Sequence, residues 1–119
     1  MPWAWARLRV DVNCGLRRGA WYRVVSVTRN KAVLEVSREA LTVARRLVQM
    51  VFSRPFSWSV VPRPEGAAQL PSEWGARYAV CPVCRARAPI AEHPINLRCP
   101  RCNGLFRVAW EERYLRPLE

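Results

Sequence analysis

The chain has 119 residues, of which 20 are basic and 9 are acidic, giving a formal net charge of +11. This length allows one domain or two small ones. No stretch reaches the roughly eighteen apolar residues that a membrane span needs, and the first residues lack the apolar run of an export signal, so we expect a cytoplasmic protein with no membrane partner.

The positive charge is expected to attract polyanions, and nucleic acid is the commonest polyanion in a cell. Nineteen of the basic residues are Arg and only Lys31 is Lys. A GC-rich coding sequence or a hot habitat would raise the Arg content without any binding purpose. Charge alone therefore favours a nucleic-acid partner without establishing one.

The N-terminal half of the chain predicts β-structure. Residues 7–14 alternate between apolar and polar side chains, which is the period of a half-buried strand. Residues 21–28 are rich in β-branched and aromatic side chains and predict a second strand. A polar turn at 29–31 leads to its hairpin partner at 32–36. Residues 58–61 predict a further strand.

Residues 38–52 allow two interpretations. Their apolar side chains fall at helical spacing, which predicts an amphipathic helix. The same stretch also divides into a strand at 41–43, a single turn at 44–47 and a strand at 48–52. We favour the strands, because the flanking segments are strand-like and sequential strands tend to pair. The helix, which would give an α+β fold, is the alternative.

The predicted order of strand, hairpin, short strand, single turn and closing strand resembles that of an SH3-like barrel. The resemblance covers residues 8–61, with the turn Ala44-Arg45-Arg46-Leu47 where that fold has its 3₁₀ turn. It implies a small β-barrel domain over residues 1–63. The composition then shifts to Pro, Glu, Gly, Ala and Gln, which predicts a linker at 64–75.

Two cysteine pairs lie beyond this linker. Cys81 and Cys84 have two residues between them, as do Cys99 and Cys102, and fourteen residues separate the pairs. A tight turn across two residues brings both thiols of a pair onto one metal ion, so this is the spacing of a four-thiolate Zn²⁺ site. Four protein ligands leave no position for water, so we expect the metal to hold the fold without doing chemistry.

Two other chemistries use the same residues. A Cys-Pro-x-Cys pair can be a redox dithiol, and four thiolates can hold iron in an iron–sulfur cluster. Two pairs at this spacing, outside a βαβ context, favour metal over redox chemistry. The paired arrangement favours zinc, but the sequence alone leaves iron open. A fifth cysteine, Cys14, lies in the alternating stretch and is expected to be a small buried apolar residue.

The cysteine pattern resembles the zinc-ribbon family over residues 78–110. The resemblance rests on the four cysteines and implies a zinc ribbon over residues 76–119, including a C-terminal tail. Members of this family are common in transcription and translation machinery and bind DNA, RNA or protein. The resemblance therefore specifies the metal and the fold but not the partner.

No catalytic constellation is evident in the sequence. His93 is the only histidine, and Glu92 beside it is a lone carboxylate. We expect no enzymatic activity and no small-molecule substrate.

Arginines cluster where a polyanion could reach them. An Arg side chain binds a phosphate through two hydrogen bonds and stacks on bases, although an ordinary solvated surface is the alternative for each cluster. The candidates for nucleic-acid contact are Arg17 and Arg18 in a loop, Arg45 and Arg46 on a polar face, and Arg85, Arg87, Arg98 and Arg101 around the cysteine pairs.

Of the six tryptophans, Trp110 is expected to pack on the predicted ribbon or to join it to the N-terminal domain, and the other five divide into two groups. Trp21 and Trp58 lie in predicted strands and are expected to fill the barrel core. Trp3, Trp5 and Trp74 lie outside any evident core, so they either pack against their own domain, stack on bases or insert into a partner protein.

The sequence thus predicts a mainly β protein, an SH3-like barrel followed by a zinc ribbon. Its predicted function is non-enzymatic, zinc-stabilised nucleic-acid binding, as an accessory of the ribosome or transcription machinery. RNA is favoured over DNA as the nucleic acid, but the sequence alone leaves the choice open. The partner would be the nucleic acid itself or a ribonucleoprotein or polymerase complex. The alternative is a protein-interaction module that serves as a small subunit of a larger complex.

Overall fold

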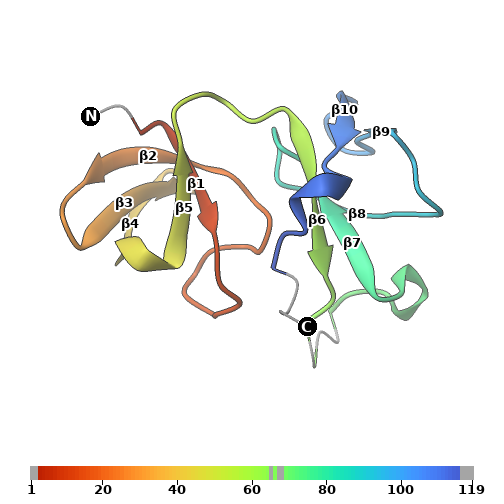
Figure 1. The fold of residues 1–119 in the computed structure, drawn as a ribbon, viewed down its shortest axis with the longest axis horizontal. Helices are drawn as coiled ribbons and strands as arrows, with labels where there is room; N and C mark the ends of the chain where they lie inside the picture. The colour runs from red at the N-terminus through yellow and green to blue at the C-terminus, as the bar shows by residue number, and fades with distance from the viewer. Residues whose placement is uncertain (1–2, 65, 67–68, 116–119) are drawn as a thin grey trace. The chain divides into compact units, whose positions relative to one another are not determined.

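The fold consists of two compact units, Met1–Pro55 and Phe56–Glu119. The structure is a computed structural model, and it describes residues 3–64, 66 and 69–115. Each unit contains a five-stranded sheet (Figure 1), which confirms the mainly β class. Among the described residues, no helix has the length and hydrophobicity needed to cross a membrane.

The first unit is a single curled sheet. Its elements are β1 (Trp5–Leu8), β2 (Tyr22–Val27), β3 (Lys31–Val36), β4 (Glu39–Ala44), the 3₁₀ turn η1 (Arg45–Leu47) and β5 (Val48–Val51). The strand order is β4-β3-β2-β1-β5, and all neighbours are antiparallel. Because only the three residues of η1 join the two edge strands β4 and β5, the sheet must curl until these edges approach, which makes it a half-barrel (Figure 1).

The strand interpretation of residues 38–52 is confirmed, and the helix alternative is wrong. The β3–β4 ladder runs from Lys31 opposite Ala44 to Val36 opposite Glu39, so β3 satisfies the backbone of β4. β5 pairs in turn with β1. The 3₁₀ turn lies where the sequence predicts a single turn, and the apolar residues that suggested a helix lie instead on two separate strands.

The first strand is shorter and earlier than the alternation at residues 7–14 predicts. β1 ends at Leu8, which pairs with Val48 at the start of β5. One further backbone bond, from Arg9 N–H to Leu47 O (2.9 Å), follows before the chain leaves the sheet. The alternation continues into a loop that has no strand partner, and Cys14 is only half-buried there.

The core of the first unit contains a buried charge. Leu8 and Leu34 are fully buried and Trp21 is 4% exposed, which confirms the prediction that Trp21 is a core residue. The buried Arg7 side chain places its guanidinium 4.5 Å from the centroid of the Trp21 ring and donates from Nε to Gln49 Oε1 (3.1 Å). Packing on an aromatic face and a hydrogen bond together compensate for removing this cation from water.

The second unit is built from two hairpins and a central strand. Its elements are β6 (Ser57–Pro62), η2 (Ser72–Trp74), β7 (Arg77–Val80), β8 (Arg87–Pro89), β9 (Asn96–Arg98), β10 (Leu105–Val108) and η3 (Trp110–Glu112). The strand order is β8-β7-β6-β10-β9. β6 is parallel to β10 and antiparallel to β7, so it lies between the β7–β8 hairpin and the β9–β10 hairpin.

The SH3-like resemblance over residues 8–61 groups the strand at residues 58–61 with the first domain, but this strand, as β6, forms the centre of the second sheet. Trp58 gives the physical reason. It is fully buried in a cluster that includes Ala79, Cys81, Cys99 and Val108, which come from both hairpins. Its indole N–H donates to Leu97 O (2.7 Å).

Residues 64–75, predicted as a linker, connect β6 to β7 within the second unit. Residues 65, 67 and 68 of this segment lie outside the described residues. The Arg63 guanidinium donates to Leu70 O (2.8 Å) and Pro71 O (3.0 Å), so hydrogen bonds anchor the described part of the segment to the end of β6.

Trp58→Ala should lower the free energy of unfolding of the full chain by about 3–5 kcal/mol, because it leaves a cavity between the hairpins and frees a carbonyl. Chemical denaturation followed by far-UV circular dichroism measures the change. Phe56→Ala, which truncates a neighbouring side chain that is 63% exposed, should change stability by no more than about 0.5 kcal/mol. Equal effects of the two substitutions would contradict the central role of β6.

Candidate metal centre

The first cysteine pair lies in a tight turn between β7 and β8. The Cys81 N–H donates to Ala86 O (2.9 Å), and the Arg85 N–H donates to Cys81 O (3.2 Å). These bonds fold the backbone around the Cys81 thiol. Arg85 has a φ of +63°, so the turn closes with a non-glycine residue in the left-handed region, as the sequence requires of a turn without glycine.

The second pair lies in an equivalent turn between β9 and β10. The Cys99 N–H donates to Gly104 O (2.8 Å), and the Asn103 N–H donates to Cys99 O (2.9 Å). Asn103 takes the left-handed conformation, with a φ of +63°. The glycine is needed for space, because a Cβ atom at Gly104 would lie 2.5 Å from the Phe106 ring.

The two turns bring the four thiols together. The Sγ atoms of Cys81, Cys84, Cys99 and Cys102 all lie within 4.8 Å of one another. The Sγ–Sγ distance is 3.7 Å between Cys81 and Cys102 and 3.5 Å between Cys84 and Cys99, and none of the four is in a disulfide. Zn–S bonds of about 2.3 Å give a tetrahedron with edges of about 3.8 Å. The cluster therefore has the size needed to hold a metal ion.

The four thiols differ in exposure. Cys81 and Cys99 are buried, Cys84 is half-buried and Cys102 is exposed. Backbone N–H groups point at the buried sulfurs: Val83 donates to Cys81 Sγ (3.4 Å), and Arg101 donates to Cys99 Sγ (3.4 Å). Such bonds favour the thiolate form, which is the form that binds metal.

The thiols also differ in acidity. Burial raises the pKa of Cys81 to about 12 and also raises the pKa of Cys84. At Cys99 burial again raises the pKa, but hydrogen bonds, chiefly from the backbone N–H groups of Cys102 and Arg101, outweigh it and bring the pKa to about 7. The metal-free cluster therefore holds bound protons at neutral pH, and a metal ion must displace them.

His93 lies outside this cluster. Its ring stacks on Trp110, with centroids 3.8 Å apart, and the Arg77 guanidinium lies 4.4 Å from the centroid of the same indole. The Trp110 indole N–H donates to Pro94 O (2.7 Å). These contacts make the loop between the cysteine pairs part of the packed surface of the second unit.

The arginines predicted from the sequence lie in varied surroundings. Arg18 is in an ion pair with Asp11, and Arg98 donates to Asn103 O (2.8 Å). Arg17 and Arg101 are exposed, and Arg85 and Arg87 are half-buried beside the first cysteine turn.

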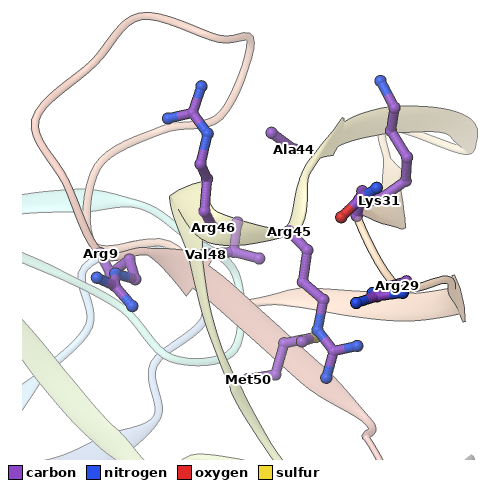
Figure 2. Close-up of a pocket in the computed structure, with 9 residues that line it drawn as sticks. Arg9, Arg29, Lys31, Ala44, Arg45, Arg46, Val48 and Met50 are labelled. Atoms are coloured by element: carbon purple, nitrogen blue, oxygen red, sulfur yellow. The ribbon is translucent and has the colours of Figure 1, made fainter.

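Arg45 and Arg46 lie together at η1, on a cavity of the first unit (Figure 2). Three further basic residues, Arg9, Arg29 and Lys31, line the same cavity and were not among the predicted contacts. Arg29 and Lys31 lie in the polar turn at 29–31 and Arg9 lies alone, so no local pattern groups them with Arg45 and Arg46.

Two tryptophans outside the predicted core pack within the first unit. The Trp3 ring stacks on Phe52, with centroids 4.5 Å apart, and the Arg54 guanidinium lies 4.9 Å from the centroid of the Trp5 ring. Trp74 is half-buried in η2.

No protein-family model matches the chain, and no curated protein or solved structure matches it either. The assignment of a metal centre therefore rests on the spacing and the geometry of the four cysteines.

Cys102→Ser should abolish stoichiometric metal binding, because it removes one of four converging ligands. Cys14→Ser should leave it unchanged, because Cys14 is the one cysteine outside the cluster. Elemental analysis of both variants, purified under reducing conditions, measures the ratio of metal to protein. Equal metal content in the two variants would contradict the assignment.

Metal affinity should increase steeply with pH. Because the raised pKa values of Cys81 and Cys84 keep both thiols protonated near neutrality, at least two protons must leave on binding. The apparent affinity for Zn²⁺ should then rise at least about a hundredfold from about pH 6 to 7. Competition with a chromophoric chelator at the two pH values measures the change, and a pH-independent affinity would show that the thiols are already ionised.

Proposed function

We propose that the four cysteines bind one Zn²⁺ ion, and that this ion stabilises the second unit as a zinc ribbon. Two hairpin turns that present four thiols at tetrahedral spacing support the proposal. Four thiolates fill the coordination sphere, so the proposed ion has no position for a reacting water, and its proposed role is structural and not catalytic. Metal binding would supply on the order of 10 kcal/mol to a unit with a small core.

We also propose that the first unit is an SH3-like barrel. The order of β2, β3, β4, η1 and β5, with a 3₁₀ turn before the closing strand, supports this.

The proposed partner of the protein is nucleic acid, RNA rather than DNA. The single observation that carries this proposal is the uneven charge of the two units. Residues 1–55 contain 11 basic and 3 acidic residues, a net charge of +8, whereas residues 56–119 contain 9 and 6, a net charge of +3. A compact unit with this excess attracts phosphate backbones. The role that fits best is that of an accessory in the ribosome or transcription machinery.

A protein-interaction module is the second candidate function. Large apolar side chains of the second unit support it: Ile95 is 75% exposed, Phe56 63% and Leu105 54%. Side chains of this kind contribute affinity when a partner covers them. Purification from cells with a stoichiometric protein partner that survives nuclease treatment would favour this function.

The full metal-loaded chain should bind RNA with an affinity that falls steeply with salt. For a single strand, the logarithm of the affinity should fall by about 0.7 per phosphate contact for each tenfold increase in salt. Fluorescence anisotropy with labelled RNA and DNA, between about 50 and 200 mM salt, measures this dependence. An absence of binding at the lowest salt concentration would end the nucleic-acid proposal and leave the metal centre unaffected.

A further inference from the structure

A cavity of about 590 Å³ opens on the first unit beside η1 (Figure 2). Its basic lining residues are Arg9, Arg29, Lys31, Arg45 and Arg46. Four of these are exposed and Arg45 is half-buried, so the charged groups are accessible from solvent. The volume lies within the range of about 300–1,000 Å³ typical of pockets that hold small ligands.

Backbone hydrogen bonds hold the walls of this cavity in place. The Arg45 N–H donates to Asn30 O (2.8 Å), which ties η1 to the turn between β2 and β3. The Thr28 N–H donates to Lys31 O (2.9 Å) across that turn, and the Arg45 guanidinium donates to Thr28 O (3.2 Å). The backbone that carries the cations is therefore ordered before any ligand binds, which reduces the entropy lost on binding.

The positive charge of the cavity is not neutralised by the protein. No acidic residue lines it, and among the described residues none of its five cations is in an ion pair. The first unit has only three acidic residues. Lys31 and Glu39 lie at the two ends of the β3–β4 ladder, and Glu35 is one residue pair closer to Lys31 than Glu39 is. Asp11 forms an ion pair with Arg18. Five uncompensated cations around one cavity repel one another unless an anion joins them.

The remaining lining consists of the polar residue Asn30 and an apolar wall formed by Ala44, Val48 and Met50. A bare inorganic anion makes no favourable contact with such an apolar wall, whereas a sugar or a base can pack on it. A duplex is a wide convex cylinder, and it cannot enter a cavity of this volume. A membrane surface is flat and would leave the cavity unfilled. The observations thus favour a flexible chain that carries phosphates and apolar groups together.

We propose that this cavity is a binding site for single-stranded nucleic acid, with phosphates on the five cations and one or two nucleosides against the apolar wall. The proposal rests on the nucleic-acid function proposed above and gives it a location. It places the contact on the first unit, at residues 9, 29, 31, 45 and 46, and not around the cysteine turns.

A charge-matched pair of variants tests the site. Arg29→Gln with Arg46→Gln removes two cations that line the cavity, and Arg23→Gln with Arg38→Gln removes two exposed cations of the same unit that do not. The probe is a short fluorescein-labelled oligouridylate, titrated with the full metal-loaded chain over a salt series. Thermal unfolding of each variant checks that the fold is retained.

The cavity variant should bind at least about tenfold more weakly than the wild type at low salt, and its salt slope should be smaller by about 1.4. The affinity of the control variant should fall by less than about threefold under the same conditions. Equal losses in the two variants, or no loss in the cavity variant, would overturn the site while leaving nucleic-acid binding intact. Equal affinity for a duplex of the same length, or tighter binding to phosphatidylserine vesicles, would overturn the assignment to a single strand. If the wild type binds neither this probe nor the duplex at low salt, the proposed function itself fails.

Discussion

The second unit depends on one constraint, which is that two short hairpins must hold four thiols within 4.8 Å of one another. Neither hairpin can meet it alone, because each contributes only two cysteines. β6 solves the problem by pairing with β7 on one side and β10 on the other. The buried Trp58 packs against residues of both hairpins and fixes their separation through its bond to Leu97 O.

The two units are organised by different forces. The first has an apolar core of its own around Leu8, Leu34 and Trp21, in which Arg7 is the buried charge. The second has small hairpins whose shared core includes two of the cysteines themselves, Cys81 and Cys99. Binding of a metal ion would therefore be coupled to core formation there, since two of the four residues that could hold the ion also fill the interior.

The surface charge follows the same division. Most of the excess positive charge lies on the first unit, which has no candidate metal ligands in a cluster among its described residues. There the half-barrel brings together the segment after β1, the β2–β3 turn and η1, and their cations surround one cavity. A curled sheet can collect charges from distant parts of the chain because the connections between its strands converge at its ends.

The sequence alone was enough to predict that the four cysteines form one cluster, because the spacing of two thiols across a two-residue turn is a local property. It also indicated β2, the β2–β3 hairpin and the 3₁₀ turn at residues 45–47, where β-branched and turn residues act over a few positions. The strand that the sequence predicts at residues 7–14 is wrong beyond Leu8, because alternating polarity indicates half-burial and not the presence of a partner strand. Only the tertiary structure assigned β6 to the second sheet, since its parallel pairing with β10 joins residues 57–58 to 107–108. For the same reason only the fold grouped Arg9, Arg29 and Lys31 with η1: long-range strand pairing, which leaves no local trace in the chain, determines which loops meet.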